Sequence, residues 1–192
     1  MSDMAIEYER HRITVEEYHR MLDAEVFDPG RRIELVEGEL LERVRPMNPP
    51  HASSVQRLNV LLVTTLGTKA TVRCQLPVTL PPDSEPHPDF ALARLDAHAY
   101  GDRHPNPDDL LLLIEVADSS RDLDRRQKIP LYARRGISEV WLVDLVDGVI
   151  VVHREPIGDW YGSIHTAKRG DFVSPLAFPD TRFAVDDLVG TV

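Results

Sequence analysis

The feature that most constrains the fold is the sequence LLLIEVA at residues 111–117, an apolar run that contains one glutamate, Glu115. A continuous apolar run of this length is typical of a strand that is covered on both faces. An ionised carboxylate inside such a strand is costly unless a cation or hydrogen-bond donors meet it. The chain must therefore supply a partner for Glu115.

The N-terminal third of the sequence predicts a helix, a hairpin and a second helix. Thr14 followed three residues later by Glu17 is a capping box, which predicts a short helix. Alternating apolar and polar residues around Glu37 and Gly38 predict a β-hairpin. After an expected loop at residues 47–51, leucine and valine recur at helical spacing over residues 52–66, and a strand is expected over residues 71–80.

The remainder of the sequence predicts further strands around one helix. A strand should start near Asp89, and a polar loop at residues 96–109 separates it from the apolar run. A helix within residues 121–135 should stop at Gly136 and either be kinked at Pro130 or begin near it. Two strands should meet at an Asp147-Gly148 turn, with short strands from residue 160 and a final turn near residues 184–190.

This order of elements predicts an α/β (α+β) fold. From residue 89 to residue 152 the expected order is strand, strand, helix, strand, strand. Such an order indicates a central mixed β-sheet flanked by helices, with one right-handed crossover and additional β-hairpins. Residues 1–192 are expected to form a single domain with a sizeable core.

Charge and composition narrow the function classes. A net charge of −10 argues against a protein that coats nucleic acid, so any nucleic-acid contact must be local. The single cysteine, Cys74, excludes an intrachain disulfide and a cysteine-rich zinc site. No apolar run approaches the roughly 20 residues that span a bilayer, and the start of the chain is too charged for a signal peptide. We expect a cytoplasmic protein without a membrane partner.

One local source of positive charge exists in the segment after the apolar run. Six basic residues fall within fifteen positions: Arg121, Arg125, Arg126, Lys128, Arg134 and Arg135. Two aspartates, Asp122 and Asp124, are interleaved with them. The cluster is therefore either a contact surface for phosphates or a solvated, salt-bridged helix face.

A second carboxylate, Asp89, begins the strand that precedes the apolar run in the sequence. Neighbouring strands would bring Asp89 and Glu115 together, and two buried carboxylates repel each other unless a cation lies between them. Mg²⁺ fits such a pair, because it takes one or two carboxylates and fills its other positions with water and phosphate oxygens. In the alternative, Asp89 is only a turn residue after Pro88 and Glu115 pairs with an arginine.

These residues resemble the signature of the PD-(D/E)XK nuclease superfamily. Pro88 and Asp89 are followed by Glu115, Val116 and Ala117, but that signature has lysine where Ala117 stands. The chain has only three lysines, and Lys128 lies on the segment that follows the Glu115 strand. A lysine in an arginine-rich chain indicates a need for a compact ammonium group, although its position can also arise by chance.

The spacing of several segments is similar to the Uma family of restriction-endonuclease-like proteins, in which the lysine has moved to this helix. The segments that carry the resemblance are Asp89, residues 115–120, Asp124, Lys128, Tyr132 and residues 136–144. The resemblance implies a restriction-endonuclease-like core and a metal-dependent DNA endonuclease. Asp89, Glu115 and the Val116 carbonyl would hold Mg²⁺, for which Mn²⁺ substitutes, and Lys128 would act on the attacking water.

The resemblance also implies auxiliary residues and a partner. Arg121, Arg125 and Arg126 would contact DNA phosphates weakly, and the nuclease would act as a homodimer. Glu34 would be a fourth catalytic residue in the same cleft, and His51 and Tyr132 would be auxiliary residues. The alternatives are that Glu34 is an exposed hairpin residue and that His51 is a solvated loop residue.

Two other functions remain open from the sequence. One is a catalytically silent relative that binds DNA or a protein, which the acidic net charge favours and the retention of Asp89, Glu115 and Lys128 opposes. The other is an interaction domain in which an arginine neutralises Glu115 and no metal binds.

Overall fold

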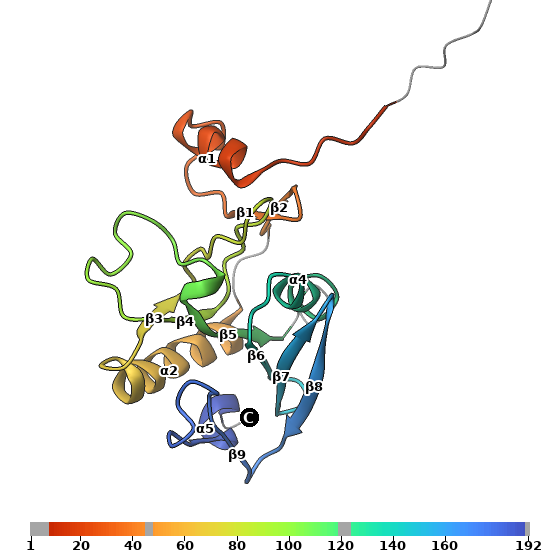
Figure 1. Cartoon of the computed structure of the whole chain (residues 1–192). Helices are drawn as coiled ribbons and strands as arrows, with labels where there is room; N and C mark the ends of the chain where they lie inside the picture. Colours follow the sequence, from red (N-terminus) through yellow and green to blue (C-terminus); the bar gives the residue numbers. More distant parts are fainter. Residues whose placement is uncertain (1–7, 45–47, 119–123, 191–192) are drawn as a thin grey trace, which may run out of the picture.

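The computed structural model describes residues 8–44, 48–118 and 124–190, and it is built around a six-stranded sheet (Figure 1). The strand order follows the chain: β3 (Thr71–Cys74), β4 (Phe90–Ala93), β5 (Leu110–Ala117), β6 (Glu139–Asp144), β7 (Val149–Ile157) and β8 (Trp160–Ala167). Only the β5–β6 pair is parallel, and the other neighbouring pairs are antiparallel. The predicted mixed sheet is confirmed.

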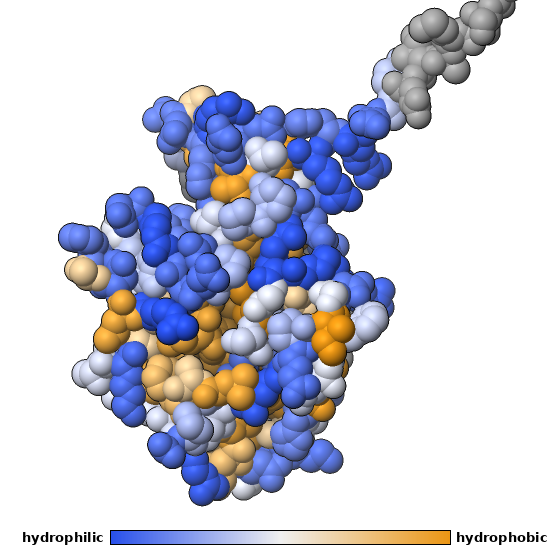
Figure 2. Space-filling view, viewed as in Figure 1, coloured by the Kyte–Doolittle hydropathy of each residue, from blue (hydrophilic) through white to orange (hydrophobic). Residues whose placement is uncertain are grey.

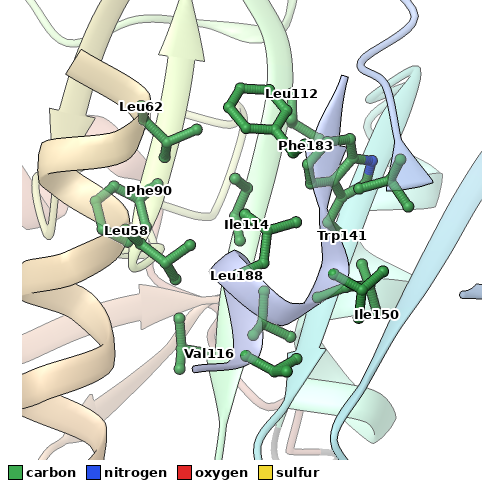
Figure 3. Close-up of a cluster of buried hydrophobic side chains, with 14 of the residues drawn as sticks. Leu58, Leu62, Phe90, Leu112, Ile114, Val116, Trp141, Ile150, Phe183 and Leu188 are labelled. Atoms are coloured by element: carbon green, nitrogen blue, oxygen red, sulfur yellow. The ribbon is translucent and has the colours of Figure 1, made fainter. Parts of the chain in front are cut away.

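Helices cover both faces of this sheet. On one face α2 (Pro49–Leu66) and α5 (Val185–Val189) pack against the strands. Figure 3 shows Leu58 and Leu62 of α2 and Leu188 of α5 directed at the strand residues of this core. On the other face α4 (Ile129–Arg134) packs against the sheet, and Leu131 and Tyr132 are fully buried there. The connection between β5 and β6 therefore carries α4 across the sheet.

Strand β5 is buried on both faces, as its apolar sequence predicts. Ile114 and Val116 belong to the core under α2, whereas Leu113 and Ala117 belong to the core under α4. Because side chains alternate along a strand, Glu115 lies on the α4 face together with Leu113 and Ala117. The alternation of side chains along β5 therefore directs the buried Glu115 toward α4.

The helix and hairpin predicted before residue 45 are both present. Helix α1 (Val15–Asp23) opens with the Thr14–Glu17 capping box, in which the Thr14 side chain accepts from the Glu17 N–H at 3.2 Å. Strands β1 (Ile33–Val36) and β2 (Glu39–Glu42) pair around Glu37 and Gly38. Both turn residues have positive φ, 50° and 76°, as tight hairpin turns require. Among the described residues, no helix is long and apolar enough to span a membrane.

Three boundaries differ from the sequence prediction. The predicted loop at residues 47–51 is wrong in its C-terminal part, because α2 already begins at Pro49; Asn48 caps it by accepting from the His51 N–H at 2.9 Å. The strand expected over residues 71–80 stops at Cys74, since Gln75 has a φ of 53°. The final turn is instead the short helix α5, whose five residues are too few to show a periodic pattern.

The sequence left open whether the helix is kinked at Pro130 or begins near it. A π-helical segment, η2 (Asp124–Lys128), leads directly into α4, and Pro130 lies in the first turn of α4. Proline has no N–H and its ring collides with the carbonyl four residues earlier, so an α-helix cannot pass through it undisturbed. The α-helix therefore begins next to Pro130 and ends at Arg134, two residues before Gly136, whose φ is +72°. Lys128 stands at the junction of η2 and α4.

The shorter elements close the structure at its edges. Two short strands, β9 (Phe172–Val173) and β10 (Phe183–Ala184), pair ahead of α5. A single 3₁₀ turn, η1 (Pro107–Asp109), leads into β5. Cys74 is half-buried against the α2-side core, close to the small core residue that the sequence predicts.

Adjacent residues of α2 test this packing. Leu62 is fully buried under α2, whereas Val63 is 47% exposed. We expect Leu62→Ala to lower the free energy of unfolding by about 2–5 kcal/mol, because it leaves a cavity in the core. Val63→Ala should change it by less than about 0.5 kcal/mol. Urea denaturation of both variants measures the difference, and equal losses would contradict the assigned face of α2.

Candidate functional site

Four ionisable side chains meet under α4, where β4 begins and β5 ends. Asp89, Glu115 and Lys128 are at most 3% exposed, and Glu34 is 9% exposed. They come from four segments: the hairpin strand β1, the residue before β4, strand β5 and the end of η2. The structure thus brings together the four residues that the sequence predicts as a catalytic set.

Asp89 is held by three hydrogen bonds that reach both of its oxygens. His51 Nε2 lies 3.2 Å from Asp89 Oδ1, and the Gln75 side-chain amide donates to the same oxygen at 3.1 Å. The Val116 N–H donates to Oδ2 at 2.9 Å, which ties Asp89 directly to the residue after Glu115. Because an ionised carboxylate only accepts, the proton in the first bond lies on His51 Nε2.

These bonds decide the ionisation of Asp89. Burial by itself raises the pKa of Asp89, but the hydrogen bond and charge of His51, the Val116 N–H and the charge of Lys128 together outweigh it. The pKa of Asp89 is therefore lowered from its usual value, and the side chain is a carboxylate at neutral pH.

Glu115 finds its partners on the helical segment that follows its strand. The Tyr132 hydroxyl donates to Glu115 Oε1 at 2.6 Å, and Lys128 Nζ lies 3.3 Å from the same oxygen. Both partners are buried. A cation of the chain therefore already lies beside Glu115 and offsets part of the repulsion expected between the two buried carboxylates.

Lys128 is surrounded by acceptors from three segments. Besides Glu115, its Nζ lies 3.5 Å from Glu34 Oε2 and 3.5 Å from the His87 carbonyl oxygen. Glu34 is in turn fixed by the His87 N–H, which donates to its Oε2 at 3.0 Å. The alternative that Glu34 is an exposed hairpin residue is wrong, because the hairpin turns this side chain inward onto Lys128.

His87 is a site residue that the sequence analysis missed. Its backbone contacts both Lys128 and Glu34, and burial, followed by the opposing influences of Glu34 and Lys128, leaves the pKa of His87 lowered. The signal was its position two residues before Asp89, between Pro86 and Pro88. Because of those two prolines, the segment was predicted to be a break between two strands.

A second group of residues joins α2 to the site. His51, one turn into α2, is 8% exposed, so the alternative of a solvated loop histidine is wrong. Asn48, which caps α2, also donates from its side-chain amide to Asp118 Oδ2 at 2.7 Å, just beyond β5. Asn48, Gln75 and Asp118 were not singled out from the sequence, since each has a common structural role at a cap or a loop.

The arginines of the predicted cluster have different environments in the structure. Arg134 pairs with Glu37 at 2.6 Å, and Arg135 pairs with Asp83, so the salt-bridged alternative holds for these two. Arg126 is exposed on η2. Arg121 lies outside the described residues, and the side chain of Arg125 also lies outside them.

The oxygen donors of the site suit a hard divalent cation. In an extended strand the N–H and C=O of one residue point to the same edge, so the Val116 carbonyl faces the Asp89 side, as its N–H does. Two carboxylates and a carbonyl are a donor set that Mg²⁺ accepts when water and substrate complete its shell. Within the described part of the chain no three His, Cys, Asp or Glu side chains converge as a metal cage, so any ion here would depend on such additional ligands.

Comparison with known proteins gives a family and a fold. Residues 15–186 match the Uma2 family, described as "Putative restriction endonuclease". A solved structure from Anabaena variabilis ATCC 29413, described as "a putative nuclease belonging to DUF820", superposes with a TM-score of 0.68 at 16% identity. The similarity covers 92% of this chain and 97% of that one, and it shows a shared fold. No curated protein sequence matches.

The hydrogen bonds of Asp89 predict a pH-dependent effect of Asp89→Asn. An amide presents an NH₂ group to donors that now meet an oxygen, so the variant should lose about 1–3 kcal/mol of unfolding free energy at pH 7. Because the folded pKa of Asp89 is lowered, its contribution is complete above the unfolded pKa of about 4 and is lost as the pH falls through the folded value. The difference in unfolding free energy between wild type and variant should therefore be smaller at pH 3 than at pH 7. Urea denaturation at both pH values will measure it.

A matched control separates this effect from the general loss of a negative charge. Asp28 is exposed, and Asp28→Asn removes the same charge without disturbing a buried contact. It should change stability by less than about 0.5 kcal/mol at either pH. If Asp89→Asn behaves like Asp28→Asn, the buried hydrogen bonds of Asp89 do not stabilise the fold.

Proposed function

Because the chain belongs to the Uma2 family, described as "Putative restriction endonuclease", we propose that it is a divalent-metal-dependent endonuclease that hydrolyses DNA phosphodiester bonds. The observation that carries the proposal is the position of Lys128. Its ammonium group lies 3.3 Å from Glu115, although it comes from a helical segment that follows the strand. It supplies, from a different place in the sequence, the amine that the related nuclease signature has at the position of Ala117.

The proposed metal ligands are Asp89, Glu115 and the Val116 carbonyl. The cation we propose is Mg²⁺, with Mn²⁺ as a substitute, because the donors are all oxygen and only two are charged side chains. When bound, such a cation supplies Lewis-acid stabilisation of the phosphoryl oxygens. The hydrogen bonds from His51 and Val116 keep Asp89 ionised and oriented before any cation arrives.

The remaining side chains have roles that follow from their contacts. Lys128 is proposed to orient the attacking water and to offset negative charge that builds up on the phosphoryl group. Glu34 and the His87 carbonyl act as positioning groups, since each lies 3.5 Å from the ammonium. Tyr132 is a positioning residue for Glu115 through its hydroxyl. A buried, hydrogen-bonded ammonium of this kind needs no reorganisation at the moment of reaction.

DNA is the proposed substrate, and the contact is proposed to be weak and local. The net charge of −10 opposes extended binding to phosphates. Arg126 is exposed two residues before Lys128, and Arg121 and Arg125 are the other proposed phosphate contacts. We further propose that residues 1–192 act as one domain and that two copies act together, which would allow both strands of a duplex to be cut.

Lys128 variants test the catalytic assignment. Lys128→Ala should lower the turnover of DNA cleavage in Mg²⁺ on the order of a hundredfold or more, the scale of losing one transition-state stabiliser. Lys128→Arg should not rescue, because a guanidinium is larger and remains protonated. The double variant Lys128→Ala with Ala117→Lys should recover part of the activity, since residue 117 lies on the same strand face as Glu115.

Metal binding provides the control for these variants. Calorimetric titration with Mn²⁺ should give nearly the same affinity for wild type and Lys128→Ala, while Glu115→Gln should abolish binding. Cleavage by Lys128→Ala at the wild-type rate would refute the role of Lys128. A wild type that binds Mn²⁺ but cleaves no DNA would favour a catalytically silent binding module instead.

The salt dependence of DNA binding tests the arginine contact. Arg126→Ala should reduce the slope of log K against log salt by about 0.9, the value for one phosphate contact. The control is Arg31→Ala, which removes an exposed arginine beside Asp28, far from η2 in the sequence. Equal slopes for wild type and Arg126→Ala, measured by fluorescence anisotropy, would show that Arg126 faces away from DNA.

A further inference from the structure

Strand β8 is an outer edge of the sheet. It pairs with β7 over its whole length, and no other strand of the described chain pairs with it. In an antiparallel edge strand, alternate residues direct their N–H and C=O groups away from the sheet. Over the eight residues of β8, this leaves a row of donors and acceptors to which another strand can bind.

The sequence of β8 has none of the usual protection of an edge. Residues 160–167 contain no Asp, Glu, Lys, Arg or Pro, in a chain of which 28% is charged. Proteins commonly protect exposed edges with charges, prolines or very short strands. The opposite edge of this sheet follows that rule, since β3 has only four residues.

A hydrophobic patch accompanies this edge. Trp160 and Ile164 are each 61% exposed, and Ile157, which pairs with Trp160 from β7, is 53% exposed. The Ile157 Cδ1 atom lies only 2.9 Å from where a Cβ of Gly162 would be, so Ile157 covers Gly162 between the other two. Figure 2 shows hydrophobic surface over this hairpin, at the right of the view. Tryptophan is enriched in protein interfaces.

We propose that β8 is a dimer interface, at which two copies of this chain pair antiparallel through β8 and continue the sheet from one protomer into the other. Antiparallel pairing of a strand with its own copy satisfies a two-fold axis, so the same surface serves both sides. Two chains of charge −10 repel each other over most of their surface, and a strand without Asp, Glu, Lys or Arg allows closer approach. The Glu155 carboxylate near Gly162 belongs to β7 and not to the pairing strand. With the two-fold axis at Gly162, Trp160 of one protomer lies opposite Ile164 of its partner. This inference does not depend on the proposed activity.

Sedimentation velocity of matched variants tests the interface. Wild type should sediment as a dimer of about twice the chain mass of 21.7 kDa. Ile164→Lys places a charge on the edge and should weaken dimerisation at least tenfold. The control is Val60→Lys, which makes the same type of change at a 59% exposed position on α2 and should leave the dimer unchanged. Circular dichroism confirms that both variants are folded.

Cross-linking then tests whether β8 itself forms the contact. In a Cys74→Ser background, which removes the single native thiol, Ser163→Cys places a thiol near the middle of β8. A short bifunctional thiol reagent should link this variant into dimers, whereas Ser53→Cys, exposed on α2, should stay monomeric on a denaturing gel. A wild type that is monomeric at high micromolar concentration overturns the proposal. So does a dimer that resists Ile164→Lys or cross-links only through Ser53→Cys.

Discussion

The buried ammonium of Lys128 is the interaction on which the site depends. It lies between Glu115 on β5 and Glu34 on β1, and it also contacts the backbone of His87 ahead of β4. Removing one member of such a group would leave an uncompensated buried charge, which is far more costly than an imperfect exposed ion pair. The hairpin, the sheet and the helical crossover are therefore held to one another through a polar centre as well as through apolar packing.

This centre explains features of the backbone that are otherwise unusual. Among the described residues after β5, the π-helical η2 passes into an α-helix at Ile129, next to Pro130. Lys128 stands where these two geometries meet, and π-type turns occur frequently at functional sites. The cap of α2 has a comparable double role, because Asn48 both begins the helix and contacts Asp118 after β5. In both places, the end of a helix positions polar groups at the end of the same strand.

The family and the fold do not by themselves establish the chemistry. A solved structure at 16% identity shares the architecture, and one fold can support different functions. What supports the proposed hydrolysis of phosphodiesters is the particular set of Asp89, Glu115 and Lys128 with its supporting hydrogen bonds. The lysine reaches Glu115 from another element, which means that the site is recognised by its arrangement in space and not by a contiguous motif.

The sequence by itself determined the pattern of strands around Glu115 and the identity of the central acids. Local rules sufficed there: the apolar run, the Thr14 capping box and the Asp147-Gly148 turn each depend on neighbouring residues, which the sequence contains directly. Only the tertiary structure decided that Glu34 and His51 are buried, that His87 contacts Lys128, and where the helix begins relative to Pro130. Glu34 and Lys128 are 94 positions apart in the sequence, yet 3.5 Å separates their charged atoms. No local pattern encodes such a distance, because it results from the packing of the hairpin and the crossover on the same face of the sheet.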